Sequence, residues 1–190
     1  MNQKVKGPTN QRRRGWQATA DLCVLDREWL ADRGVPSPAI TEPWPIRSAR
    51  VKFDGLHGFD FNTEGDQALI FKAEDRGEQT DFVAWEPRTG NLASWYGNAF
   101  CLGDADDIFN PATYFRDGYL RIHASPLEWL RAGRDGIVIL RRDFAYAHLR
   151  FCRQLLCDDP AHAEEVERLL QAPGPTAQIF IADEAELEFV

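Results

Sequence analysis

Apolar residues recur at helical spacing near the start of the chain and at strand spacing further on. The helical segment lies between residues 19 and 34, where four apolar residues fall on one face. They are Leu22, Leu25, Trp29 and Leu30. Gly34 is suited to end this helix. The proline-rich stretch 36–45 predicts an extended connector, because a residue that precedes proline disfavours the helical region.

Between residues 46 and 96 apolar residues alternate with polar ones, which is typical of strands with one buried face. Turns at 75–78 and 87–90, each containing a glycine, separate three of these runs. The runs are Gln67–Ala73, Thr80–Trp85 and Leu92–Tyr96, and a shorter run, Arg50–Phe53, precedes them. Short turns between alternating runs predict an antiparallel meander, with Phe71, either Phe82 or Val83, and Trp85 buried against the first helix.

The strongest structural signal is the stretch 119–140. It begins with a short apolar strand at 119–122, breaks at Ser125 and Pro126 into a short amphipathic helix, and ends in the unbroken apolar run 137–140. An unbroken apolar run is typical of a strand covered on both faces. The preceding segment 97–117 combines chain-breaking residues with large apolar ones, so we expect a packed loop with one or two helical turns there.

The remaining chain completes a small β-α-β-α-α-β unit. Helices are predicted at 143–156 and 160–170, followed by a final strand at 177–181. The predicted fold is therefore α+β: an N-terminal helix packed on an antiparallel β-meander, followed by a small α/β unit. The expected divisions are 1–17 as a disordered basic arm, 18–116 as the helix and meander, and 117–190 as the α/β unit, the last two forming one continuous globular domain.

Charge is distributed unevenly along the chain. The 190 residues carry a net charge of −8, but residues 1–17 contain five basic residues and no acidic one, which leaves −13 for the rest. An acidic body is a poor surface for non-specific nucleic-acid binding. The candidate nucleic-acid contacts are therefore Arg12, Arg13 and Arg14 in the arm, whose alternative role is that of a solubilising tail. The acidic body favours a protein partner of basic character.

Several features predict a cytoplasmic protein without membrane contact. The N-terminus is polar and charged, without the apolar stretch of a secretory signal. The longest purely aliphatic run, 137–140, is far shorter than the roughly 20 residues of a membrane span. The four cysteines form no close pair, so free thiols are expected.

Two groups of residues are candidates for catalysis. His57, Asp60 and Asp66 fall on one predicted loop, where a histidine with carboxylates could act as a general base or hold a metal ion. Loops are also rich in Asp for purely structural reasons. His123 follows the first strand of the α/β unit and precedes a helix, a junction where ligands bind in open α/β sheets. Asp143 follows the later strand of that unit.

His148, Cys152 and Cys157 are candidate metal ligands. His148 and Cys152 are four residues apart on a predicted helix and would share a face, with Cys157 at the helix end. A structural zinc site requires four ligands, usually in two close pairs, so ordinary buried thiols are the alternative. The sequence contains no glycine-rich phosphate loop and no nucleophile elbow, so we expect no bound cofactor.

The strand, the helix that begins with Ser125-Pro126-Leu127 and the apolar strand that follows resemble the start of a toprim-type domain, which occurs in primases and topoisomerases. That family uses a Glu after its first strand and a pair of acidic residues after a later one. Here His123 and Asp143 stand at the matching places, so the Glu and one acid are missing. The resemblance implies a degenerate toprim-like or nuclease-like metal-dependent enzyme acting on nucleic acid, and the missing acids imply that its activity is lost.

Three segments are similar to uncharacterised bacterial proteins that accompany plasmid or integrated-element genes. They read EPRTGNLASW, DIFNPATYF and LRIHASPLEWLRAGRDGIVIL, and the similarity covers residues 45–182. It implies an accessory role in a mobile element and no particular activity. Since no complete catalytic or cofactor motif is present, the predicted function is that of a non-enzymatic intracellular interaction protein of a bacterial mobile genetic element.

Overall fold

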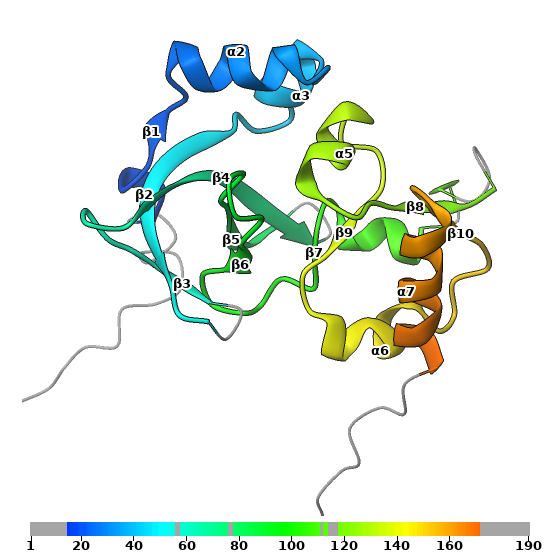
Figure 1. Cartoon of the computed structure of the whole chain (residues 1–190). Coiled ribbons are helices and arrows are strands. Elements are labelled where there is room, and N and C mark those ends of the chain that lie inside the picture. Colours follow the sequence, from blue (N-terminus) through cyan, green and yellow to red (C-terminus); the bar gives the residue numbers. More distant parts are fainter. Residues whose placement is uncertain (1–14, 56–57, 76–77, 111, 114–117, 172–190) are drawn as a thin grey trace, which may run out of the picture.

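The computed structural model describes residues 15–171 except 56–57, 76–77, 111 and 114–117 (Figure 1). It confirms the α+β class, because an antiparallel sheet with packed helices is followed by a smaller unit of helices and short strands. Arg12, Arg13 and Arg14 and the predicted strand 177–181 lie outside the described residues. No helix in the described part is long and apolar enough to cross a membrane.

The main sheet has six antiparallel strands in the order β1-β2-β4-β5-β6, with β3 paired to β2. The strands are β1 (Ala20–Asp21), β2 (Arg47–Phe53), β3 (Phe59–Phe61), β4 (Asp66–Asp75), β5 (Glu78–Trp85) and β6 (Leu92–Ser94). Phe71 of β4 pairs with Val83 of β5, and Ala84 of β5 pairs with Ala93 of β6. The predicted meander is therefore present as β4, β5 and β6.

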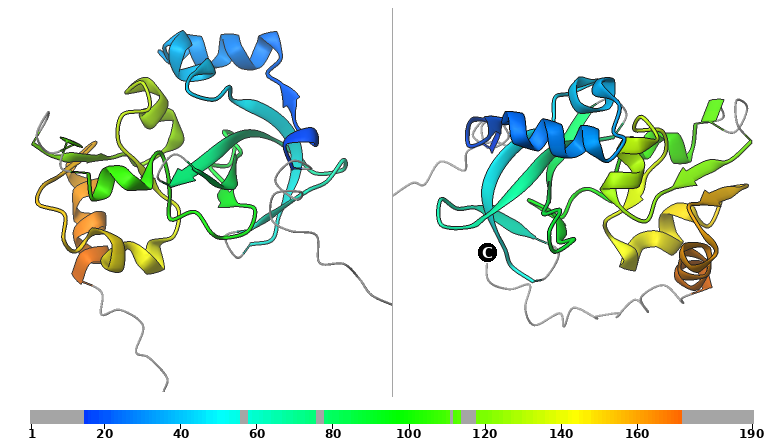
Figure 2. Two further views of the ribbon diagram at one scale, coloured as in Figure 1. Left: turned by 180° about the vertical axis from the view of Figure 1, so that it is seen from behind. Right: turned by 45° about the horizontal axis from the view of Figure 1, so that its top comes forward.

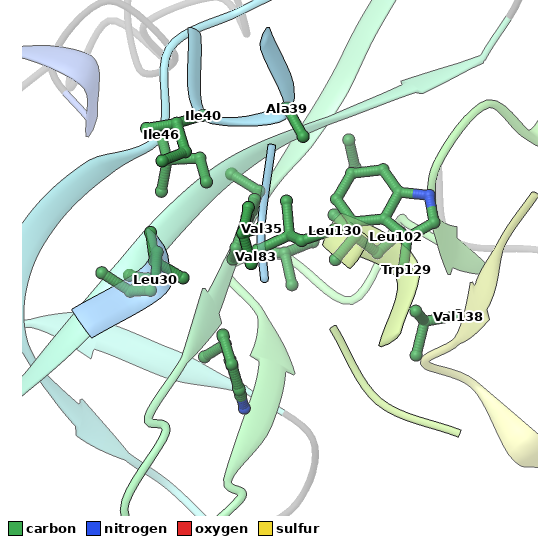
Figure 3. Close-up of a cluster of buried hydrophobic side chains, with 14 of the residues drawn as sticks. Leu30, Val35, Ala39, Ile40, Ile46, Val83, Leu102, Trp129, Leu130 and Val138 are labelled. Atoms are coloured by element: carbon green, nitrogen blue, oxygen red, sulfur yellow. The ribbon is translucent and has the colours of Figure 1, made fainter. Parts of the chain in front are cut away.

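Three helices pack on one face of this sheet (Figure 1). They are α2 (Val24–Asp32), α3 (Ser37–Thr41) and α5 (Pro126–Arg131). Leu69 and Val83 of the sheet belong to one buried cluster with Leu30, Ile40 and Leu130 of the helices, and Figure 3 shows most of these side chains together. Burial of a large aliphatic side chain contributes roughly 1.5–3 kcal/mol, so this cluster ties α5 to the sheet.

Aromatic rings line the opposite face of the sheet. Phe82 is fully buried there, and Trp16 stacks on it with ring centroids 5.9 Å apart. Phe61 of β3 and Trp95, which follows β6, meet edge to face at 4.9 Å, so the curved sheet brings its outer strands together. Because Trp16 packs in this cluster, the ordered fold begins before residue 17, the predicted end of the basic arm.

Two predictions for the N-terminal part are wrong. The first helix begins at Val24 instead of residue 19, because Ala20–Asp21 pairs with β2, and Leu25 is 74% exposed instead of buried. Residues 36–45 contain the helix α3 instead of a fully extended connector. Pro36 and Pro38 are compatible with this helix, since they occupy its N-cap and first turn, where no backbone N–H is required.

Four short strands organise the second unit. They are β7 (Cys101–Leu102), β8 (Leu120–Ile122), β9 (Val138–Ile139) and β10 (Leu155–Cys157). β8 pairs in parallel with β10, and β7 pairs antiparallel with β9. The predicted β-α-β arrangement is present around α5, but its two strands meet only in the parallel bridge between Ile122 and Ile137. The rest of the apolar run pairs with β7 instead.

One helix of the second unit is shorter than predicted, and two other helical segments agree with the prediction. The 3-10 helix η1 (Ala105–Ile108) confirms the helical turn expected within 97–117. The predicted helix 143–156 is divided into η2 (Arg142–Phe144) and α6 (Ala145–Leu149), and its last residues form β10. A short apolar run is compatible with either a helix or a strand. Here it forms a strand because it pairs with β8. α7 (Pro160–Gln171) confirms the last predicted helix.

Candidate functional site

The described carboxylates of the predicted loop site are held apart by β2. His57 lies outside the described residues. Asp60 in β3 and Asp66 at the start of β4 pair with β2 from its two opposite edges. Gly65 precedes β4 and packs against the backbone of β2, where a Cβ would collide with the carbonyl oxygen of Val51. Glycine, which has no Cβ, permits this close approach of the two backbones. Asp60 and Asp66 therefore do not form the carboxylate pair that a metal-dependent site requires.

His123 lies at the predicted junction between β8 and α5, with a carboxylate beside it. Because β8 and β10 are parallel neighbours, the residues that follow them, His123 and Asp158, meet at the carboxyl ends of both strands. His123 Nδ1 lies 2.8 Å from Asp158 Oδ1, and the Ala124 N–H donates to Asp158 Oδ2 at 2.7 Å. The other predicted residue, Asp143, pairs with Arg141.

Both ring nitrogens of His123 are hydrogen-bonded. Nδ1 faces the Asp158 carboxylate, and Nε2 lies 2.9 Å from the backbone carbonyl oxygen of Asp135. Because Asp158 and the Asp135 carbonyl occupy both ring nitrogens, each nitrogen is already engaged within the protein. Neither nitrogen is open to a substrate. With 7% of its side chain exposed, His123 holds strands and loop together and is not placed to act as a general base.

A second histidine, His162 of α7, lies beside the same carboxylate. Its Nδ1 is 3.9 Å from Asp158 Oδ2, too far for a hydrogen bond, and this buried nitrogen has no partner among the described residues. Burial lowers the pKa of His162, although Asp158 and Asp159 act in the opposite direction. The neutral ring is therefore favoured. The part of the chain that the structure describes contains no group of three or more His, Cys, Asp or Glu side chains that could hold a metal ion.

The three candidate metal ligands lie in different structural settings. His148 of α6 stacks on Phe100, with ring centroids 4.1 Å apart. Cys152 lies beyond the end of α6, so the predicted shared helix face does not exist, and Cys157 lies in β10. Burial, together with Asp158 and Asp159, raises the pKa of the Cys157 thiol, which disfavours the thiolate that metal binding and nucleophilic attack require.

A groove between α2 and the sheet is a further concave site in the described part of the chain. It has a volume of about 720 Å³. Its apolar lining includes Leu25 and Trp29 of α2, Ala68 and Leu69 of β4, and Pro87 in the turn after β5. Trp29 is fixed from below by an edge-to-face contact with Trp85, with ring centroids 6.2 Å apart. The groove is thus built on side chains of the main core.

Leu25 is the exposed part of this groove. It is 74% accessible, and the adjacent Val24 is 68% accessible, although both belong to the first turn of a helix that packs on the sheet. Cys23, whose Sγ accepts from the Asp26 N–H at the helix N-cap, is exposed and also lines the groove. In the sequence, this site is indicated by the adjacent apolar residues Val24 and Leu25, because together they extend the apolar surface of the helix beyond one face.

Charged groups surround the apolar lining. Asp26, Asp66 and Glu86 contribute carboxylates, and Arg33 and Arg88 contribute guanidinium groups. Glu86 is buried and accepts from the side chains of Thr89 and Asn91. The Arg33 guanidinium lies 3.9 Å from the Trp29 ring and donates to the Trp29 carbonyl. Asp26 and Asp66 are therefore the carboxylates best placed to meet a ligand at the rim.

Comparison with protein-family models, with curated proteins and with solved structures finds no match to this chain.

Proposed function

We propose that this is a non-enzymatic binding protein, and that the groove beneath α2 takes an apolar, positively charged segment of a partner protein. The observation that carries the proposal is Leu25, a large aliphatic side chain left 74% exposed at the edge of a groove of about 720 Å³. Exposed apolar side chains that border a concave surface are typical of interaction sites.

The chemistry of the partner follows from the lining of the groove. Leu25, Trp29 and Leu69 offer aliphatic and aromatic contacts, which suit an apolar anchor such as Leu, Ile or Phe. Asp26 and Asp66 at the rim favour Lys or Arg beside that anchor. The charge of −13 that the chain carries outside residues 1–17 increases the rate at which a basic segment is captured.

The wider context of this proposal is the resemblance of residues 45–182 to proteins of mobile elements. It supports a partner encoded by the same kind of bacterial element, with the present protein as an accessory component inside the cell. The alternative, a degenerate toprim-like or nuclease-like enzyme, requires at least three candidate groups in one cleft. The described candidates are divided between the sheet and the second unit, and His123 is engaged at both nitrogens.

A peptide-display selection against the full chain tests the proposal. Selected peptides should combine a large apolar residue with Lys or Arg. Leu25→Asp should weaken their binding by tenfold or more, because a charge replaces an apolar contact of roughly 1.5–3 kcal/mol. Phe109→Asp is the matched control, since Phe109 is 58% exposed and lies at the end of η1 outside the groove.

Leu25 is largely exposed, so its substitution should leave the thermal midpoint unchanged, which separates lost binding from lost folding. Equal affinity of the Leu25→Asp and Phe109→Asp variants for the selected peptides would overturn the proposal. A selection that yields only acidic peptides would overturn the proposed chemistry of the partner.

A further inference from the structure

A second surface combines exposed aromatic rings with arginines. It is formed by η2, α6 and the residues that follow, and we call it the Arg–aromatic surface. Its members are Arg141, Phe144, Tyr146, Arg150, Phe151 and Arg153. Phe144 is 41%, Tyr146 37% and Phe151 72% exposed. Large rings on a surface are unusual enough to require an explanation when several occur in one short segment.

Guanidinium groups lie over the faces of these rings. Arg141 is 4.6 Å from the centroid of Phe144, and Arg150 is 5.8 Å from that of Tyr146 and 4.5 Å from that of Phe151. One arginine therefore contacts two exposed rings at once. Such cation–π contacts hold each guanidinium group against a ring, which restricts the motion of both groups before any ligand binds.

The charge of this segment is opposite to that of the protein as a whole. Residues 141–153 contain four arginines and a single acidic residue, in a chain of net charge −8. Arg141 pairs with Asp143, and Arg142 pairs with Glu165 of α7. Within the described residues, Arg150 and Arg153 have no carboxylate partner, and both are exposed. Positive charge is therefore left available beside Phe151.

We propose that the Arg–aromatic surface binds single-stranded nucleic acid. Every base has a flat face that stacks on an aromatic ring, and guanidinium groups both stack on bases and bind phosphates. The Arg150–Phe151 pair provides these two contacts at adjacent positions. A surface that recognised an acidic peptide would use the arginines but would have no role for three exposed rings.

Double-stranded DNA fits this surface less well. Reading of the major groove requires a helix or ribbon that enters it, whereas α6 has five residues and packs against α7 (Figure 1). Bases that are already unstacked can reach the rings without the energy needed to open a duplex. The surface lies at the end of the molecule opposite to α2 (Figure 2), so this binding is independent of the groove proposed above.

Fluorescence anisotropy with a labelled mixed-sequence single-stranded DNA of about 12 nucleotides tests the inference on the full chain. The same measurement is made with a single-stranded RNA, a duplex and a poly-glutamate peptide. Single strands should bind most tightly. Phe151→Ala should weaken this binding about tenfold, within the range measured for one base–aromatic stack, and Arg150→Ala should weaken it and reduce its salt dependence. Phe109→Ala is the control, because it removes an exposed ring elsewhere.

A further variant distinguishes binding by the basic arm from binding by this surface. In a chain with Arg12→Ser, Arg13→Ser and Arg14→Ser, the effect of Phe151→Ala should persist. Single-strand affinity that is insensitive to both Phe151→Ala and Arg150→Ala would overturn the inference. Tighter binding of poly-glutamate than of either single strand would overturn it in favour of an acidic protein partner. Self-association that is abolished by Arg150→Ala, without any oligonucleotide binding, would overturn it in favour of a second copy of this chain.

Discussion

Two regions of the molecule, the groove beneath α2 and the Arg–aromatic surface that includes α6, both leave large apolar side chains in contact with water, and Figure 2 shows α2 and α6 on opposite sides of the molecule. Leu25 is 74% exposed at the first, and Phe151 is 72% exposed at the second. They differ in shape and charge. The groove is concave with three carboxylates and two guanidinium groups around it, whereas residues 141–153 contain four arginines and one acid.

This difference shows that exposure alone does not identify a partner. An aliphatic side chain in a concave, partly acidic setting suits an apolar and basic peptide. A ring beneath a guanidinium group suits a base beside a phosphate. Similar exposed fractions therefore lead to two different proposals, and the experiments below test whether the two surfaces are distinct in this way.

The largest effect should come from Asp81, which fixes the segment between the two regions. Asp81 is 1% exposed, and its carboxylate accepts from the N–H groups of Phe82, Tyr96 and Asn98. Burial raises the pKa of Asp81, although these N–H groups oppose the shift. Asp81→Asn turns an amide NH₂ toward the backbone donors. It should lower the free energy of unfolding by about 2–4 kcal/mol, measured by urea denaturation at pH 8.

Asp60→Asn is the control for this prediction, since Asp60 is an exposed strand residue. Its effect should stay within about 0.5 kcal/mol. Equal losses for the two variants would mean that Asp81 does not hold the segment 96–98, and that the two regions are joined by other contacts.

Whether the two surfaces bind different ligands is tested by measuring both kinds of binding on a variant of each surface. Leu25→Asp should weaken binding of selected peptides tenfold or more and leave single-strand binding unchanged. Phe151→Ala should weaken single-strand binding about tenfold and leave peptide binding unchanged. Both affinities are measured on both variants by anisotropy. A variant that impairs both ligands equally would show that the surfaces are coupled or that one of the ligands is bound elsewhere.

The ligand affinities of the two surfaces should also differ in their dependence on salt concentration. If Arg150 and Arg153 each contact one phosphate, single-strand affinity should fall about sevenfold between 50 and 200 mM salt, from a slope of roughly −0.7 per phosphate. Peptide binding in the groove depends mainly on apolar contacts and should change less. The measurement is a salt titration of both affinities on the chain with Arg12, Arg13 and Arg14 replaced by Ser. Parallel slopes would contradict the assignment.

The smallest predicted effect is the pH dependence of stability that His162 of the second unit contributes. The pKa of His162 in the fold lies below the 6.5 of an ordinary histidine because of burial, so the unfolded chain binds the proton at higher pH. Stability should therefore fall as pH decreases from about 6.5 toward the native pKa. Asp158, Asp159, His123 and Arg142 face this ring and are unchanged in His162→Gln, which should lose stability less steeply between pH 7 and 5. Identical slopes in urea denaturation would contradict the prediction.

The central sheet could be predicted from the sequence because its pattern is local. Alternation in 67–73, 80–85 and 92–96, with short turns between, specifies a meander without knowledge of the rest of the chain. The errors arise where tertiary contacts decide. Residues 155–157 form a strand because β8 lies beside them, and Leu25 is exposed because the first turn of α2 borders a groove instead of the sheet.

The candidate sites were less accessible to prediction. His123 was placed at the right junction from the strand-to-helix pattern, but its partner is Asp158, 35 residues later, and not Asp143. Only the parallel pairing of β8 with β10 brings these two residues together. The groove combines side chains from α2, β4 and the turn after β5, so no single motif could reveal it. The arginines and aromatic residues of 141–153 can be recognised in the sequence, but the exposure of their side chains cannot.

The most direct test of the proposed function is amide hydrogen–deuterium exchange of the full chain with and without a selected basic–apolar peptide. Bound peptide should slow exchange in α2 and at the start of β4, around residues 24–32 and 66–69, and leave residues 141–153 unchanged. Protection confined to the second unit, or absent from α2 at saturating peptide, would contradict the claim that the groove beneath α2 is the site of partner binding.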